Sequence, residues 1–598
     1  MIGADNSKAS VIQSAKSSPV PRRNFTLRAR STAPTLSVLA WTDRRASSAS
    51  RAARVIGAAA ALLVLVDCGG PHADGGVHAA TAATQGNGAL AGTGTSPHAT
   101  VGANATADAS IPAEIARVQA AVSALRGLPF RVAVPSTPQS RDQFRQFVHE
   151  DLAHELGPDK NAALSKALAH TGFLPQPLDF AATMEEAETT QVAAYYDPRT
   201  GRFHTVAAAS NSDERDGVVA HELTHALQHQ HFDLIAYDGG SDNQQRLSDD
   251  ERAARRYVVE GEATFVMLAY QSASGSGRAR HLGPLQVAGV RMTLTMLSAV
   301  DYVELLALLR TGEGADRLDA EEKEALDQLA RLPPLVAVTM VDPYIRGAFL
   351  VSEAWARGGW ARVARLYHEP PQSTEQVLHP IEKLLEARDP PVAIHLPPPS
   401  ATAAPRFTST QPLLQETAGE LDWRCYFKTW GDPDPEGAAD GWGGDLVTVW
   451  ERSGKPVAAI ATSWDTPADA TEFEGAYRLS LSQRFEPRPA KSAELATAVT
   501  RVTTTAPTVD GDGQTRWTIR RPDGTLVVVR RRGLDVDILD GARADEVEPL
   551  LAMLRAADRK VVVASSPGKP DKVPRHEQAQ PTHDRPRGSS SQPPSRLP

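Results

Sequence analysis

The chain has 598 residues, of which 41% are hydrophobic and 23% charged, and its formal net charge at pH 7 is −9. A chain of this length cannot fold around one core, so we expect two or three domains. The acidic balance gives no electrostatic reason to expect a nucleic-acid partner. Two cysteines cannot build a disulfide framework. No uninterrupted apolar run reaches the roughly 20 residues of a membrane-spanning helix, which argues against a polytopic membrane protein.

Residues 1–67 have the features of an export signal behind a basic extension. Residues 1–54 carry ten Lys or Arg and two acidic residues, and residues 55–66 form a short apolar segment. This order is typical of a secretory signal peptide. Because 67 residues is long for such a signal, we expect translation to start near Val38, which leaves a leader of about 30 residues.

The apolar segment ends in Leu65-Val66-Asp67-Cys68-Gly69-Gly70. This stretch resembles the lipobox of bacterial lipoproteins, in which the cysteine is lipidated and becomes the first residue. Asp67 departs from that pattern, which has Gly, Ala or Ser at this position. We expect an exported protein held at the cell envelope by a lipid on Cys68. Simple secretion, or a single weak anchor with an incidental Cys68, is the alternative.

Both ends of the mature chain have compositions that do not support a packed core. Residues 68–110 are rich in Gly, Ala, Thr and Ser, and neither they nor residues 565–598 contain an aromatic residue. We therefore expect a disordered tether and a disordered tail. A Pro-rich linker at residues 397–409 separates two folded blocks, 111–396 and 410–564.

The first block is predicted to be mainly helical with one small β-hairpin. Apolar residues recur at helical spacing within residues 111–125, 144–156 and 162–174. Residues 191–196 and 202–206 are predicted strands, joined by the turn sequence Asp-Pro-Arg-Thr-Gly. From residue 213 to 396 helical patterns dominate.

The second block is predicted to be a smaller α+β domain. Thr466 and Pro467 are typical of the start of a helix, which we expect to reach Phe485, and a closing helix is expected at residues 545–556. Six of the nine tryptophans lie between Trp423 and Trp517. They indicate either a carbohydrate-binding face or, more commonly in a small sheet domain, core aromatics. The predicted strands are residues 446–450, 457–461, 517–521 and 526–530.

The sequence His221-Glu222-Leu-Thr-His225 lies on a strongly apolar predicted helix. At about 100° per residue the two histidines are one turn apart on one face, with Glu222 beside them. Two imidazoles so placed can share one Zn²⁺ at about 2.0–2.1 Å, and the carboxylate can reach a water on the metal. We expect a zinc site rather than two histidines hydrogen-bonded in a core. The other side of the helix carries residues that would pack into the core: Val219, Leu223 and Leu227.

A catalytic zinc site needs a third protein ligand, and two residues are candidates. Glu260 lies inside an apolar helical run, where a carboxylate is expensive to bury unless it is paired or metal-bound. His231 has the spacing of the metzincin pattern, which requires a Gly at the position of Gln228 for a sharp turn. A non-Gly residue in the left-handed conformation costs about 1–2 kcal/mol. If the helix continues instead, His231 points away from His225, so we favour Glu260.

These motifs resemble those of the gluzincins, zinc metallopeptidases whose third ligand is a Glu on a second helix, often followed by Gly-x-Ala. Over about residues 120–395 the chain is similar to a set of exported bacterial metallopeptidases. The resemblance implies that His221, His225 and Glu260 bind zinc and that Glu222 is the general base. Thr264 stands where some gluzincins have an Asp that orients a histidine. The matching stretches are Tyr196-Asp-Pro-Arg-Thr, His221-Glu-Leu-Thr-His-Ala-Leu-Gln with His231-Phe-Asp-Leu, Glu260-Gly-Glu-Ala-Thr, Ser373-Thr-Glu-Gln-Val-Leu-His-Pro and, more weakly, Gly441-Trp-Gly-Gly-Asp.

The expected reaction is attack of water on a peptide carbonyl, with Glu222 taking the proton of the water and passing it to the leaving amine. A further donor must stabilise the developing oxyanion. Tyr196, Tyr344 and His379 are candidates, each of which could instead be an ordinary buried side chain, and we prefer His379. The predicted strand at residues 191–196 would either pair with an extended substrate or serve as scaffold.

Three functions from different classes are compatible with the sequence. The leading hypothesis is a zinc endopeptidase that cleaves protein or peptide substrates outside the cytoplasm. The second is a proteolytically inactive zinc-binding envelope lipoprotein, whose second block binds a partner or a glycan. The third is a structural envelope protein in which the two motif helices are only core. No oligomeric state follows from the sequence.

Overall fold

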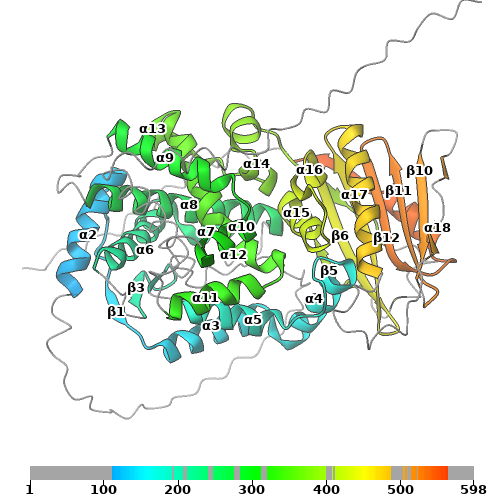
Figure 1. Ribbon diagram of the computed structural model, residues 1–598, viewed down its shortest axis with the longest axis horizontal. Coiled ribbons are helices and arrows are strands. Elements are labelled where there is room, and N and C mark those ends of the chain that lie inside the picture. The colour runs from blue at the N-terminus through cyan, green and yellow to red at the C-terminus, as the bar shows by residue number, and fades with distance from the viewer. Residues whose placement is uncertain are drawn as a thin grey trace, which may run out of the picture. The chain divides into compact units, whose positions relative to one another are not determined.

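The structure is a computed structural model that describes residues 111–191, 194–206, 212–239, 247–274, 283–311, 320–398, 407, 411–485, 503–504, 508–509, 514–521 and 523–562. The leader, Cys68, the tether and the tail lie outside these residues, as does most of the linker. The fold is α+β, with a helical region followed by a region rich in strands (Figure 1). The expected fold class is confirmed.

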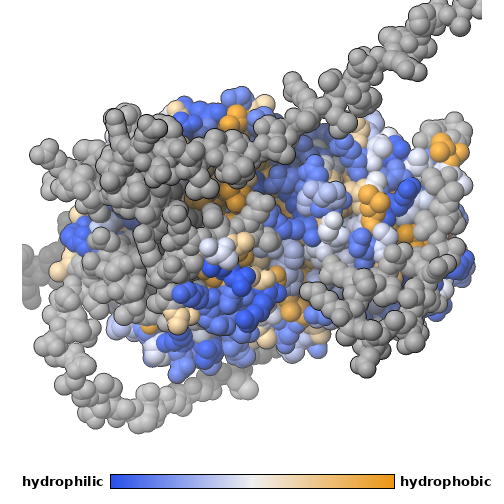
Figure 2. Space-filling view, in the orientation of Figure 1, coloured by the Kyte–Doolittle hydropathy of each residue, from blue (hydrophilic) through white to orange (hydrophobic). Residues whose placement is uncertain are grey.

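The helical region contains most of the helices and one small three-stranded sheet (Figure 1). The faces of α3 and α11 that point to solvent are hydrophilic (Figure 2). The helices are α2 (Ile111–Arg126), α3 (Arg141–Glu155), α4 (Gly157–Thr171), α5 (Phe180–Gln191), α6 (Ser212–Phe232), α7 (Leu234–Tyr237), α8 (Asp249–Ser274), α9 (Pro284–Ser298), α10 (Tyr302–Thr311), α11 (Ala320–Arg331), α12 (Pro334–Ala356), α13 (Gly359–His368), α14 (Thr374–Leu378) and the π-helix Ile381–Glu386.

The small sheet has the order β1-β3-β2, with β1 (Ser136–Pro138) parallel to β3 (Arg202–Thr205) and β2 (Ala194–Asp197) antiparallel to it. The predicted hairpin is therefore present, and Gly201 at its turn has φ 67°, a value that glycine adopts without strain. The first strand begins later than expected, because Gln191 is the last residue of α5. The hairpin makes β2 an edge strand.

Two long helices, α8 and α12, pack closely in the core of this region. Gly261 and Gly347 meet at their crossing, where a methyl group on Gly347 would stand 3.0 Å from the Cα of Gly261. The two glycines therefore allow a close approach of the two backbones. Among the described residues α12 alone is long and apolar enough to cross a membrane, but 78% of its most apolar stretch is buried inside the structure. It is packed as a core helix.

The second region is built on an eight-stranded sheet of order β5-β6-β7-β12-β11-β10-β8, with β9 paired to β10. Thr466 caps α17 as predicted, because its hydroxyl accepts from the amides of Ala468 and Asp469. The elements are β5 (Leu414–Glu416), α15 (Gly419–Thr429), α16 (Pro435–Ala439), β6 (Trp442–Arg452), β7 (Lys455–Trp464), α17 (Pro467–Phe485), β8 (Thr503–Thr504), β9 (Thr508–Val509), β10 (Thr515–Arg520), β11 (Leu526–Arg532), β12 (Asp535–Ala542), α18 (Val547–Arg555) and β13 (Asp558–Val561).

Both faces of the large sheet are covered. Ile460 and Ile538 belong to the core shared with α17, whereas their neighbours Ala459 and Leu539 belong to a second core with α18. This alternation is what the two-residue period of a strand produces. Most of the tryptophans are core residues, as the commoner interpretation predicted, and four of them expose 2% or less: Trp423, Trp442, Trp464 and Trp517.

The aspartate of the Gly-Trp-Gly-Gly-Asp stretch connects the start of β6 to the N-terminal part of α15 by hydrogen bonds. The buried Asp445 carboxylate accepts from the indoles of Trp423 and Trp442 at 3.0 and 2.7 Å, and from the amides of Ala418 and Gly419 at 2.8 and 3.0 Å. Four donors satisfy a carboxylate completely, which makes its burial tolerable.

Several contacts join the helical region to the second region. Strand β4 (Val392–His395), the last element of the helical region, pairs with β13 near residue 560. Trp430 donates to the carbonyl of Gly172 at 2.7 Å, and Lys383 pairs with Asp465 at 2.6 Å. All described residues belong to one compact unit.

Candidate metal centre

The motif helix α6 is buried on all sides from Asp216 to Gln228. His221 and His225 are both 0% exposed and Glu222 is 1% exposed. Their Nε2 atoms lie 3.0 Å apart, with the rings nearly perpendicular at 80°. The helix therefore holds both imidazoles in a fixed relative position inside the protein.

Helix α8 brings Glu260 against the two histidines. Its Oε2 atom is 3.3 Å from the Nε2 of His221 and 3.4 Å from that of His225. Two ligands of one tetrahedral Zn²⁺, with bonds of about 2.0–2.2 Å, lie about 3.3–3.6 Å apart. The triangle of donor atoms therefore has nearly the size that zinc requires, and two nitrogens with one carboxylate oxygen suit zinc chemically. These three residues could hold a metal ion.

The charges around the triad favour one positive charge next to Glu260. Burial lowers the pKa of His221 to about 4, which keeps this imidazole neutral. Burial has the same tendency at His225, but the nearby Glu260 and Glu222 carboxylates outweigh it and raise the pKa of His225 to about 9. A buried carboxylate beside two imidazoles is electrostatically stable only with positive charge close by, which either the protonated His225 ring or a bound metal ion would supply.

His231 lies elsewhere. Helix α6 continues through Gln228 to Phe232, and the Nε2 of His231 is 2.8 Å from the carbonyl oxygen of Pro129. The sharp turn of the metzincin pattern is therefore absent from α6, as the non-Gly residue at position 228 predicted. The geometry favours Glu260 as third ligand.

Glu222 is held by the edge strand. Its Oε2 accepts a hydrogen bond of 2.7 Å from the backbone amide of Tyr196 in β2. The Tyr196 side chain points toward the hairpin turn and His229. Burial and the nearby Asp197 raise the pKa of Tyr196 to about 12. Tyr196 therefore orients the expected base through its backbone.

Tyr344 is the oxyanion candidate whose ring meets a candidate metal ligand. It lies in α12, is 1% exposed, and stacks on the ring of His221 with centroids 5.8 Å apart. Arg256, one turn before Glu260 in α8, interacts electrostatically with Tyr344 and places its Nε 3.9 Å from Glu260 Oε1. Sequence reasoning missed Arg256, because its neighbours come from another helix.

The structure places His379 with a different group. Its Nε2 lies 2.9 Å from Glu420, 3.2 Å from Arg424 and 3.5 Å from Asp440, all in the second region. With Glu420 and Asp440 it forms a second cluster of potential metal ligands, distinct from the triad. The cation of Arg424 already neutralises Glu420 there. This position gives no support to the preference for His379 as the oxyanion donor.

The residues after Glu260 have structural roles on other faces of α8. Gly261 faces Gly347 of α12. Glu262 is 1% exposed, pairs with Arg126 of α2, and accepts a hydrogen bond of 2.5 Å from Tyr367. Successive residues of a helix differ by about 100°, so three consecutive positions meet three different partners.

The stretch from Ser373 to Pro380 joins the two regions. The amide of Thr374 donates to Asp250 Oδ1 at 3.0 Å, and its hydroxyl donates to the same oxygen at 2.5 Å and accepts from the amide of Leu421 at 3.2 Å. The family-like motif therefore fixes the start of α8 against α15.

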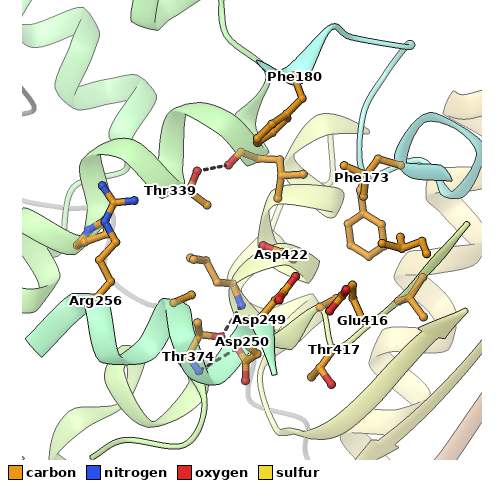
Figure 3. A pocket seen from close by; sticks show the side chains of 18 of the residues that line it. Phe173, Phe180, Asp249, Asp250, Arg256, Thr339, Thr374, Glu416, Thr417 and Asp422 are labelled. Carbon is orange, nitrogen blue, oxygen red and sulfur yellow. Dashed lines mark hydrogen bonds between the residues drawn. The ribbon is translucent and has the colours of Figure 1, made fainter. Parts of the chain in front are cut away.

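A cavity of about 50 Å³ lies beside this junction and extends along α8 to Arg256. In Figure 3, Asp249, Asp250 and Asp422 lie in the middle of the view, with Arg256 on one side and Phe173 on the other. Burial raises the pKa of Asp422 well above its usual range, and the charges of Asp250, Asp445 and Asp249 add to the effect. Burial likewise raises the pKa of Asp250, against the effect of its bonds to Thr374.

Comparison with known proteins finds a match in the second region. Residues 410–551 match a family described as a domain of unknown function, DUF8575. No curated protein and no solved structure matches the chain. The match begins where the predicted second block begins.

Proposed function

We propose that this chain is a zinc-dependent metallopeptidase that hydrolyses peptide bonds outside the cytoplasm. The observation that supports the proposal most strongly is the convergence of His221, His225 and Glu260, whose donor atoms are 3.0–3.4 Å apart. The carboxylate of Glu222 stands on the same helix and is oriented by the amide of Tyr196. Ligands and base are thus assembled from two helices and an edge strand.

The residues of the chain have distinct tasks in this proposal. His221, His225 and Glu260 hold the metal, which when bound supplies Lewis acidity that lowers the pKa of a water from 15.7 to about 7. Glu222 accepts a proton as the water oxygen attacks the peptide carbonyl carbon, and gives that proton to the amine when the carbon–nitrogen bond breaks. Tyr344 donates a hydrogen bond to the carbonyl oxygen as it becomes negative. The substrate is a protein or peptide.

The proposed location follows from the sequence. A basic region and a short apolar segment precede Cys68, which supports export and lipid anchoring at the cell envelope. A nucleic-acid partner is not proposed, because the net charge is negative.

The test combines metal analysis with cleavage of casein by the full chain in detergent. The wild type should carry about one Zn²⁺ per chain and cleave casein, and a chelator should abolish cleavage. Glu222→Gln should keep the zinc and lose activity, because an amide cannot accept the proton of the water. Loss of zinc from Glu222→Gln, or full activity in it, would contradict the assigned role.

A second candidate is a zinc-binding envelope lipoprotein without proteolytic activity. It is favoured by burial, because His221, Glu222, His225 and Glu260 are each 1% exposed or less. A polypeptide can reach these side chains only if the site opens. Bound zinc without cleavage of casein or unfolded proteins would favour this candidate over the peptidase.

A further inference from the structure

One buried glutamine connects the two helices of the metal centre. Gln228 lies in α6, three residues after His225, and is 1% exposed. Its Oε1 is 2.8 Å from the Nδ1 of His225, and its Nε2 donates to the carbonyl oxygen of Val259 at 2.9 Å. Val259 immediately precedes Glu260 in α8. One amide therefore links one ligand to the backbone beside another.

The two contacts of this amide determine which nitrogen of His225 carries a proton. A carbonyl oxygen can only accept, so the NH₂ group of Gln228 must face Val259 and the amide oxygen must face His225. That oxygen can only accept in turn, so Nδ1 of His225 must be protonated and donate. In the neutral ring the lone pair is then on Nε2, the atom that lies 3.4 Å from Glu260 Oε2.

Helix α8 offers no comparable partner at the position where related zinc enzymes have a carboxylate. Thr264 stands there, and its buried Oγ1 makes no hydrogen bond among the residues that the structure describes. The Nδ1 of His221 likewise has no hydrogen-bond partner in the described part of the chain. Gln228, by contrast, hydrogen-bonds the Nδ1 of His225 and so orients one histidine of the triad.

We propose that Gln228 is a positioning residue of the metal centre. It holds His225 in the Nδ1–H tautomer with Nε2 directed at the metal, and it ties this ring to the residue before Glu260. The inference rests on the proposed zinc site and goes beyond it by assigning the tautomer and the residue that sets it. Removal of a hydrogen bond to a metal-bound histidine weakens metal affinity by about 10–100-fold.

The experiment compares three variants of the full chain in detergent by competition for Zn²⁺ with a chelator of known affinity. Gln228→Met removes both hydrogen bonds at nearly constant volume and should weaken zinc binding by about 10–100-fold. Gln228→Glu keeps an acceptor for the Nδ1–H of His225, so it should bind zinc more tightly than Gln228→Met.

Gln376→Met is the matched control. Gln376 is also fully buried, accepts from the amide of Gln372 at 2.8 Å, and donates to the carbonyl of Asp389 at 2.5 Å, but it is not part of the triad. Its replacement should lower thermal stability about as much as Gln228→Met and leave zinc affinity unchanged. Nitrogen-15 NMR of histidine-labelled, zinc-loaded protein should find the proton of His225 on Nδ1.

The outcomes separate the inference from the proposed function. A wild type without zinc affinity would overturn both. A wild type that binds zinc, with Gln228→Met equally tight or with a proton on Nε2 of His225, would overturn the positioning role alone. Equal loss of affinity in Gln376→Met would also overturn it, because the effect would then be one of general stability.

Discussion

The crossing of α8 and α12 makes a prediction about Gly347. In Gly347→Ala the new methyl group would stand 3.0 Å from the Cα of Gly261 and closer still to the carbonyl oxygen of Tyr257. Neither backbone atom can rotate away, so the helices must separate by about 0.5–1 Å to reach ordinary van der Waals contact. Overpacking of this kind costs about 1–3 kcal/mol, and the better helix propensity of Ala returns about 1 kcal/mol. Because the methyl group would stand only 2.3 Å from the Tyr257 oxygen, the upper half of that overpacking range applies, and we expect a net loss of about 1–2 kcal/mol in the free energy of unfolding.

The separation of α8 from α12 should also displace the candidate metal ligand Glu260. Glu260 adjoins Gly261, and metal–ligand distances tolerate deviations of only about 0.2 Å. Gly347→Ala should therefore lower zinc affinity as well as stability, measured by chelator competition and by urea unfolding. Gly289→Ala is the control, because Gly289 lies on the exposed face of α9 and a methyl group there meets nothing within 4 Å. It should stabilise the protein by up to about 1 kcal/mol. The reasoning is refuted if Gly347→Ala is as stable as the wild type or keeps its zinc affinity.

Three further predictions concern the ligand, the anchor and the acidic cavity. Glu260→Ala should abolish zinc binding and His231→Ala should leave it nearly intact; the opposite result in a metal titration would make His231 the ligand. Cys68→Ser should move the protein from the detergent phase to the aqueous phase, because each buried CH₂ of an acyl chain contributes about 0.8 kcal/mol, and an unlipidated native N-terminus in mass spectrometry would argue against the anchor. The pKa of Asp422 is raised in the folded state, so above about pH 4 the folded protein holds a proton there that the unfolded chain has released. The free energy of unfolding of the wild type therefore falls relative to that of Asp422→Asn as the pH rises. Asp422→Asn should therefore raise Tm by about 2 °C or more at pH 7 and by less at pH 4; a lower Tm at pH 7 would contradict this.

The sequence predicted the parts of the site that depend on local pattern. The spacing of His221 and His225 places both on one helix face wherever that helix lies, and the apolar surroundings of Glu260 indicated a buried carboxylate. The partners of these residues could not be predicted in the same way. Arg256 meets Tyr344 across two helices, and Gly347 matters only because α12 crosses α8 at Gly261.

The same distinction explains why the sequence analysis did not predict β12, the longest of the strands that it missed. Strand β12 contains Asp537 and Asp540, and charged residues at these positions hide its apolar pattern. Both are 0% exposed in the structure because arginines neutralise them: Arg530 lies 2.5 Å from Asp537, and Arg484 lies 3.2 Å from Asp540. Ion pairs with arginines from other segments compensate for the burial of these two carboxylates. The local hydrophobic pattern of the sequence does not show such ion pairs, so it could not predict this strand.

The pairing of β4 with β13 means that the Pro-rich stretch near residue 400 is a poor place to divide this protein for expression. A fragment that stops there would leave β4 with an open edge, which is a template for aggregation, and would leave Lys383 without Asp465. A fragment that starts at residue 410 would lack the strand that covers β13 and the Thr374 hydroxyl that binds the amide of Leu421. The region that matches the domain of unknown function thus makes backbone pairing and hydrogen bonds with the helical region, and its biochemistry is best studied in the whole chain.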